Sequence, residues 1–186
     1  MKKRQFYTCL LIMYLGISCS PSRKSAAYFH ENKTAIAELR TYFNQLYTQQ
    51  SFSAGFSDKT FKYYVMQVMT DTLRAVYNNE KRKDELWENV RKFHYDTALL
   101  KKMAKRMKYI KCLWIGKSDY YFGEHQEKFD YISFKSADKA FRENKYYMLV
   151  FLEHPLEYPE FQERIDKGTF VPVDSLVYYT TTSRYR

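Results

Sequence analysis

Apolar residues recur at helical spacing in the stretch that follows Asn32. They lie on one stripe of a helix and comprise Ile36, Leu39, Phe43, Leu46 and Tyr47. Asn32 is suited to cap this helix, because an asparagine side chain can accept hydrogen bonds from free backbone N–H groups of the first turn. The segment 51–57, which contains Gly55, ends the pattern. We therefore expect a first helix that begins at about Asn32.

Two shorter amphipathic helices are predicted further along the chain. Residues 83–94 place their apolar side chains on one face, and Asp96 can cap the helix that follows. The inward residues of the first are Leu86, Trp87, Val90 and Phe93, and those of the second are Leu99, Leu100, Met103 and Met107. Both helices should pack on a core through these faces.

The run 61–77 fits two patterns. Its apolar residues follow helical spacing, and they are Phe61, Val65, Val68, Met69, Leu73 and Val76. Residues 62–65 and 70–72 would equally suit a pair of strands with a turn. We favour the helix and keep the strand pair as the alternative.

After the second short helix the period changes from helix to strand. Runs rich in aromatic and β-branched residues predict strands over 109–115, 129–134, 146–152 and 170–179. The run 146–152 is apolar throughout and predicts a central strand. Pro172 indicates either that the last strand lies at an edge or that the proline is at the start of that strand. A short helix is expected over residues 136–144.

The order of these elements predicts a single α+β domain over residues 32–186. Helices come first and strands second, which is typical of helices packed on one face of an antiparallel sheet. We expect about four strands, and a curved roll of the cystatin or NTF2-like kind would accommodate them.

The chain opens with the layout of a secretory signal peptide. Three basic residues follow Met1, and an uncharged, mostly apolar stretch covers residues 9–17. That stretch is too short to cross a bilayer core of about 30 Å as a mature helix. The composition then turns polar. We expect a signal peptide over 1–18 and a polar tether over 19–31.

The residues Leu15-Gly16-Ile17-Ser18-Cys19 end this leader. They resemble the lipobox of bacterial lipoproteins, in a loose form that resembles those of the Bacteroidota. The resemblance implies acylation of Cys19, with chains such as palmitate, and therefore a membrane anchor in the cell envelope. Ser20 after the cysteine then favours the outer membrane. Arg23 and Lys24 stand where surface-exported lipoproteins of the Bacteroidota carry an acidic run, which favours the face toward the periplasm. Ordinary signal-peptidase cleavage is the alternative, because Gly16 and Ser18 satisfy its small-x-small rule.

Positive charge is concentrated in residues 81–111. This segment holds eleven Lys and Arg residues against four Asp and Glu, while the rest of the mature chain is balanced. The outward face of the second short helix is the candidate site for an anionic surface, and it carries Lys101, Lys102, Lys105, Arg106 and Lys108. Anionic lipid or an acidic envelope protein would suit it as a partner. The alternative is a solvated face. Nucleic acid is disfavoured as a partner, because export would separate the protein from it.

Aromatic content is high, with 19 Tyr and 14 Phe. Tyrosine suits half-exposed contact surfaces, because it buries a ring while its hydroxyl stays wet. Cys9 lies in the leader, so acylation of Cys19 would leave Cys112 as the one thiol. A lone thiol forms no internal disulfide, and we expect Cys112 to be a small core residue.

The motifs that carry catalysis are weak in this chain. Ser136 and Lys139 match the S-x-x-K pattern of penicillin-interacting serine enzymes, but the further elements of that family are missing downstream. The four histidines lack the spacing of a zinc site. We therefore predict no enzyme, no cofactor and no metal, and Ser136 is better explained as a helix cap.

Two functions fit an anchored envelope protein without catalytic residues. The first is a structural, assembly or protein-interaction module. The alternative is a module that binds an envelope ligand, lipid or glycan, in an aromatic pocket. An aromatic cavity in the fold would favour the second, and a filled core with an exposed aromatic patch would favour the first.

Overall fold

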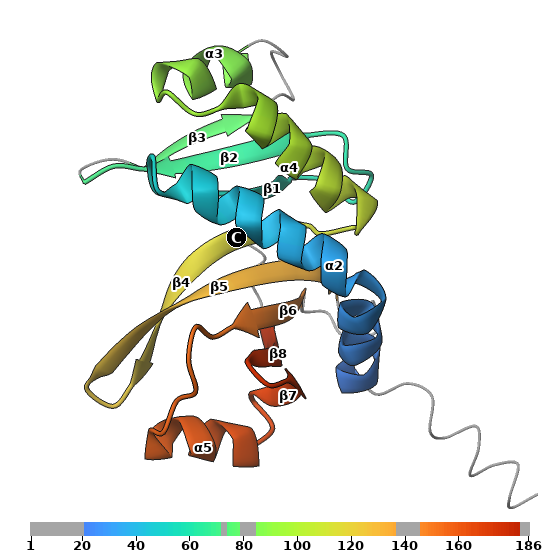
Figure 1. Ribbon diagram of the computed structural model, residues 1–186, viewed down its shortest axis with the longest axis vertical. Coiled ribbons are helices and arrows are strands. Elements are labelled where there is room, and N and C mark those ends of the chain that lie inside the picture. Colours follow the sequence, from blue (N-terminus) through green and yellow to red (C-terminus); the bar gives the residue numbers. More distant parts are fainter. Residues whose placement is uncertain (1–20, 72–73, 79–84, 137–145, 183–186) are drawn as a thin grey trace, which may run out of the picture.

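The computed structural model describes residues 21–71, 74–78, 85–136 and 146–182 (Figure 1). The predicted signal peptide and the lipobox with Cys19 lie outside the described residues. So does the helix expected over 136–144, apart from Ser136, which ends a strand.

The first described element, α2, is a long helix from Pro21 to Tyr47. It begins well before Asn32, so the predicted cap is wrong. The side-chain amide of Asn32 instead donates a hydrogen bond to the carbonyl oxygen of Tyr28, one turn earlier in the same helix.

Residues 21–31, expected to form a polar tether, are the first turns of this helix. Ser25 and Phe29 are buried there, and the Ser25 hydroxyl donates to the carbonyl oxygen of Pro21. A proline fits the first turn of a helix, where its missing N–H has no partner to lose. Packing of Phe29 on the domain therefore holds a segment whose polar composition alone does not predict a helix.

Eight strands form one open antiparallel sheet in the order β3-β2-β1-β4-β5-β6-β8-β7. Their bounds are β1 Phe52–Phe56, β2 Tyr64–Met69, β3 Arg74–Asn78, β4 Trp114–Phe122, β5 His125–Ser136, β6 Tyr146–Phe151, β7 Val171–Asp174 and β8 Val177–Thr182. The predicted α+β class is confirmed, but the sheet has eight strands rather than about four.

Strand β1 lies in the segment expected to be only a break. Gly55 is its fourth residue, and a Cβ atom there would lie 2.2 Å from the Trp114 ring of the neighbouring strand. The glycine therefore lets the indole of Trp114 lie directly over the backbone of β1. In the sequence alone, Gly55 indicates a loop, and this is why the strand was not predicted.

The helix favoured over 61–77 is wrong. A strand pair is present, as in the alternative, but its strands lie later in the chain than the expected 62–65 and 70–72. Strands β2 and β3 pair antiparallel, with Val68 opposite Ala75. Five successive residues of β2, Tyr64 to Val68, are buried, so both faces of the strand are covered. A strand buried on both faces lacks apolar-polar alternation, and its apolar run is easily mistaken for a helix.

The two short helices are confirmed as α3 (Glu85–Lys92) and α4 (Thr97–Tyr109). The Asp96 carboxylate caps α4 by accepting hydrogen bonds from the N–H groups of Ala98 and Leu99, at 2.8 and 3.0 Å. Leu99, Leu100, Met103 and Met107 are all buried, as predicted. Because α4 continues through Tyr109, the strand expected over 109–115 begins later, at Trp114.

The C-terminal part matches the prediction in outline. Strand β6 lies inside the sheet, and Pro172 lies on the edge strand β7. The run 170–179, predicted as one strand, is a hairpin of β7 and β8. The helix α5 (Pro159–Asp166) was not expected from the sequence.

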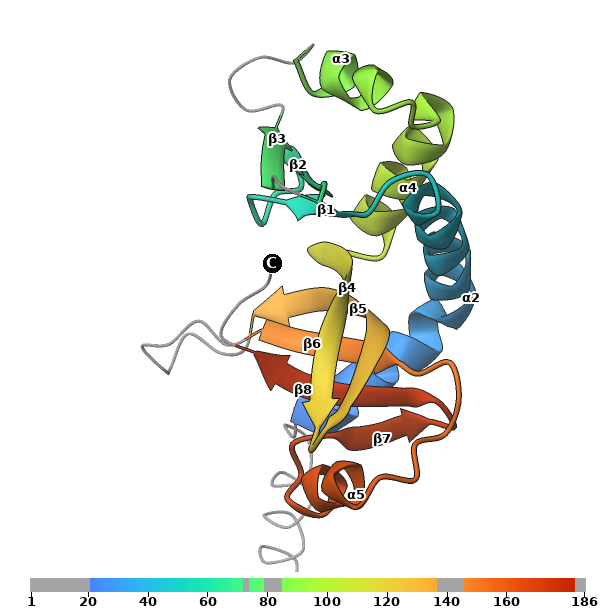
Figure 2. The ribbon, with the colours of Figure 1, turned by 90° about the vertical axis from the view of Figure 1, so that its left-hand side faces the viewer.

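The helices cover opposite faces of the sheet (Figures 1 and 2). Helix α2 runs alongside α4 and across the sheet, while α5 lies on the other face near β7 and β8. Alternate residues of β6 show the division: Leu149 and Phe151 join the core under α2 and α4, whereas Met148 and Val150 join the core under α5. The domain therefore has two hydrophobic cores, one on each face.

Candidate functional site

A pocket of about 730 Å³ lies where α2, the β1–β2 connection and the α4–β4 connection meet. Pockets of roughly 300 to 1,000 Å³ are the usual size for binding a small molecule. Its apolar walls are aromatic and aliphatic side chains from these segments and from β5 and β6. They are Ala27, Tyr28, Phe61, Tyr109, Ile110, Leu113, Phe134 and Tyr147.

The charged residues that line this pocket are mostly basic. Lys24, Lys59 and Lys111 face one acidic residue, Glu31. The ion pairs among the described residues leave Lys24 and Lys111 without a carboxylate partner. An apolar pocket with ammonium groups at its border suits a molecule that is apolar over most of its length and anionic at one end.

The loop that supplies Phe61 to the pocket is organised by Asp58. Its carboxylate accepts hydrogen bonds from the backbone N–H groups of Thr60, Lys62 and Tyr63, at 2.8 to 3.2 Å. Burial raises the pKa of Asp58, but these bonds and the Thr60 hydroxyl outweigh burial and hold that pKa below its ordinary value. Within this loop Phe61 has φ of 57°, a conformation that a bulky residue rarely adopts.

Cys112 lies in the core close to the pocket and is buried, as predicted. Its thiol lies 3.3 Å from the carbonyl oxygen of Trp114, to which it donates. Burial raises the pKa of Cys112, so the thiol stays neutral and is a poor nucleophile. The nearby hydroxyls of Tyr28 and Tyr64 are buried, and no hydrogen-bond partner for them is found in the described part of the chain.

The predicted anionic-surface residues lie on α4. Four of them, Lys101, Lys102, Lys105 and Lys108, are exposed. The fifth, Arg106, is half-buried and forms an ion pair with Glu38 of α2, so it joins two helices. The ammonium of Lys101 lies 5.1 Å from the centre of the Trp87 ring. We call Lys101, Lys102, Lys105 and Lys108 the α4 basic face.

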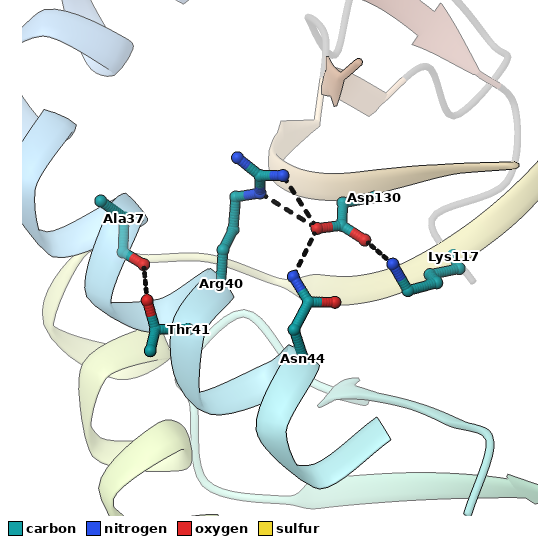
Figure 3. Close-up of polar contacts among 6 residues, drawn as sticks. All are labelled: Ala37, Arg40, Thr41, Asn44, Lys117 and Asp130. Atoms are coloured by element: carbon teal, nitrogen blue, oxygen red, sulfur yellow. Dashed lines mark hydrogen bonds and ion pairs between the residues drawn. The ribbon is translucent and has the colours of Figure 1, made fainter. Parts of the chain in front are cut away.

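A buried carboxylate connects α2 to the sheet (Figure 3). Asp130 Oδ2 accepts hydrogen bonds from Arg40 Nε and Nη2 at 3.1 and 3.0 Å and from Asn44 Nδ2 at 2.9 Å, while Lys117 Nζ lies 2.5 Å from Oδ1. Burial raises the pKa of Asp130, but the bonds from Lys117 and Asn44 and the charge of Arg40 outweigh it and lower that pKa. Each carboxylate oxygen has a partner, so we assign this cluster to holding α2 in place.

His125 stacks on Tyr158, with ring centroids 4.4 Å apart. Ser136 is the last residue of β5, while Lys139 and the helix that Ser136 was expected to cap lie outside the described residues. Among the described residues, no three His, Cys, Asp or Glu side chains gather in a way that could hold a metal ion. None of the helices in this part of the chain is long and apolar enough to span a membrane.

The aromatic pocket has no counterpart among the site residues predicted from the sequence. Its lining comes from segments that are distant in the chain, and of its three lysines only Lys111 falls in the basic segment 81–111. No protein-family model, curated protein or solved structure matches this chain. The assignment of a function therefore depends on the geometry of the pocket and of the α4 basic face.

Proposed function

We propose that this protein is a lipid-anchored envelope protein whose domain binds a small molecule in the aromatic pocket. One observation carries the proposal, the pocket of about 730 Å³ whose lining has five aromatic side chains and three lysines. Such a cavity was the feature expected to separate a ligand-binding module from a purely structural one. It favours the binding module.

The anchor in this proposal rests on the leader. A cysteine directly after an apolar stretch supports acylation at Cys19, which would hold the domain at a membrane, and Ser20 favours the outer membrane facing the periplasm. The finer comparison with a cystatin or NTF2-like roll stays a prediction, and a fold analogy would not by itself supply a function.

The α4 basic face supports a second candidate function, contact with anionic lipid or with an acidic envelope protein. Its four lysines are exposed, while Leu99, Leu100, Met103 and Met107 of the same helix are buried. Such a helix can bind an anionic surface through its charged side. This contact and ligand binding are compatible, because the pocket and the face use different side chains.

The proposed site is tested with 8-anilinonaphthalene-1-sulfonate, an aromatic anion that fluoresces in apolar sites. The protein is the full chain with Cys19→Ser, which cannot be acylated at that position. Ala27 lines the pocket and is exposed on α2, so Ala27→Trp fills the pocket without removing core atoms. Ala37→Trp is the matched control, because Ala37 is exposed on the same helix but does not line the pocket.

We expect saturable binding of the dye by the parent chain and by Ala37→Trp, and at least about tenfold weaker binding by Ala27→Trp, since a filled pocket excludes the ring system. Equal binding by Ala27→Trp and Ala37→Trp would overturn the assignment of the pocket as the binding site.

A further inference from the structure

Lys111 occupies a backbone position that helices usually give to glycine. It follows the last turn of α4 with φ of 55°. The N–H of Cys112 donates to the carbonyl oxygen of Met107 at 2.8 Å, and the N–H of Lys111 donates to that of Lys108 at 3.2 Å. These two bonds define a Schellman motif, in which the left-handed residue is most often glycine because any Cβ atom is disfavoured there.

The same motif ends two other helices of this chain, which supply an internal comparison. After α5 the left-handed residue is Gly168, with φ of 68°, and after α3 it is His94, with φ of 59°. Both helix ends have the paired backbone bonds of the motif. After α5 the N–H of Gly168 donates to the carbonyl oxygen of Ile165, and after α3 the N–H of Tyr95 donates to that of Val90. Of these three helix ends, α5 alone has the residue that adopts this conformation without steric cost.

Lys111 and Phe61 are both left-handed and both line the pocket. A lysine at a glycine position costs stability, and such strain is concentrated where a side chain serves a site. His94, which has the same backbone conformation after α3, does not line this pocket. We therefore ask which interaction of the Lys111 side chain offsets the cost of this backbone conformation.

We propose that the pocket binds a single-chain amphiphile with an anionic head, and that Lys111 binds the head. This inference rests on the proposed function of the pocket. An acyl or alkyl chain would lie against the apolar walls, while Lys111, with Lys24 and Lys59 in the same pocket lining, would bind a carboxylate or a phosphate. A charge-assisted hydrogen bond from an ammonium to such a head is among the stronger ones in proteins.

The position of the pocket along the chain fits a ligand drawn from a membrane. Lys24 lies in the first turns of α2, five residues after the predicted acylation site at Cys19. Five residues span at most about 18 Å when fully extended, so acylation at Cys19 would hold the pocket close to the bilayer surface. Fatty carboxylates and single-chain phospholipids share the required chemistry, and the experiment separates the two.

The experiment displaces bound 8-anilinonaphthalene-1-sulfonate from the full Cys19→Ser chain with three dodecyl compounds below their micellar concentrations. They are laurate, with a carboxylate head, dodecyl phosphate, and the neutral dodecyl maltoside. We expect an anionic compound to displace the dye at least about tenfold better than the maltoside. Displacement by laurate alone would identify a carboxylate head, and displacement by dodecyl phosphate alone a phosphate head.

Lys111→Gly provides a test that combines stability with binding. It relieves the left-handed strain, so its melting temperature should rise by about 2 °C. At the same time it should bind the anionic compounds about tenfold more weakly and the maltoside unchanged. His94→Gly is the matched control, because it should be stabilised in the same way and keep full binding. Lys111→Arg keeps the charge and should retain affinity.

The dye could bind in the pocket and yet be displaced as well by the neutral maltoside as by the anionic compounds, or by none of the three. Either result would overturn the proposed ligand class, but the pocket would remain a binding site. Unchanged anion binding by Lys111→Gly would overturn the role of Lys111. Dye that fails to bind in the pocket at all would overturn the proposed function and this inference with it.

Discussion

Tyr28 of α2 lies flat against Phe134 of β5, with ring centroids 4.0 Å apart and an interplanar angle of 7°. Both side chains also line the aromatic pocket. The contact that docks the first turns of α2 on the sheet is therefore also part of the pocket wall. Stability at this end of the helix and binding in the pocket depend on the same two rings.

Replacement of Tyr28 by alanine should destabilise the domain by about 2 kcal/mol, because the stacked ring is lost and α2 loses a contact with β5. Urea unfolding at neutral pH measures this change. Tyr28→Phe keeps the ring and removes a buried hydroxyl for which the described residues offer no partner, so its stability should stay within about 0.5 kcal/mol of the parent. Equal losses in the two variants would show that the ring contact is not what matters.

The cluster around Asp130 predicts a dependence of stability on pH. Replacing Asp130 by asparagine leaves the charges of Arg40 and Lys117 without their carboxylate, which should cost about 3 kcal/mol at pH 7. The pKa of Asp130 is lowered in the folded state, so near pH 4 the unfolded chain binds more protons than the folded one and stability rises with pH.

The advantage of the parent over Asp130→Asn should therefore be complete above the ordinary aspartate pKa of about 3.9 and shrink as the pH falls through the lowered value. Urea unfolding from pH 7 to pH 3 measures it. Asp119→Asn is the control, because Asp119 lies 3.8 Å from Lys128 in an exposed ion pair whose loss should cost less than about 1 kcal/mol. A constant difference between the parent and Asp130→Asn across this range would contradict the prediction.

Local signals were sufficient for the helix α4. An aspartate at its N-terminus and apolar residues at helical spacing specify a cap and a buried stripe, and both are present in the structure. The same reasoning failed for α2. Its first turns are polar, and they are held by Phe29 and Tyr28 against side chains that lie far away in the sequence.

The pocket could not be predicted for the same reason. Its walls come from two helices, two connections and two strands, and no residue in it belongs to a catalytic or ligand-binding sequence motif. Hydrogen bonds to neighbouring residues hold Phe61 and Lys111 in the left-handed conformation. Their residue types predict the ordinary conformation with negative φ, because a side chain disfavours positive φ. Strand β1 was hidden similarly, since Gly55 serves the ring of Trp114 and not a turn.

The predicted anchor has a direct test in the cell. Cys19→Ser should abolish acylation and move the protein from the membrane fraction to the soluble fraction of the envelope, because several acyl chains together make attachment stable. Fractionation with labelling by a palmitate analogue measures both effects. Cys112→Ser is the control, since that thiol is buried in the domain and should not affect labelling. A parent protein that is soluble and unlabelled would contradict the anchor.

The α4 basic face predicts salt-dependent binding to an anionic membrane. Changing Lys101, Lys102 and Lys105 to glutamine removes three exposed charges, each contributing on the order of 1 kcal/mol near an anionic surface. The Cys19→Ser chain should therefore bind phosphatidylglycerol vesicles at least about tenfold better than the same chain with these changes, at 50 mM salt. Sedimentation with vesicles measures the binding, and 500 mM salt should remove most of the difference.

The control for this variant has the same net charge. Lys33, Lys128 and Lys167 are exposed on α2, on β5 and after α5, and changing them to glutamine also removes three charges. If binding follows the α4 basic face, this control should bind nearly as well as the parent, because its lost charges lie on other parts of the surface. If it follows net charge alone, the two variants should lose affinity equally, and α4 would then be a solvated helix face. Melting temperatures within about 2 °C of the parent would show that neither set of changes unfolds the domain.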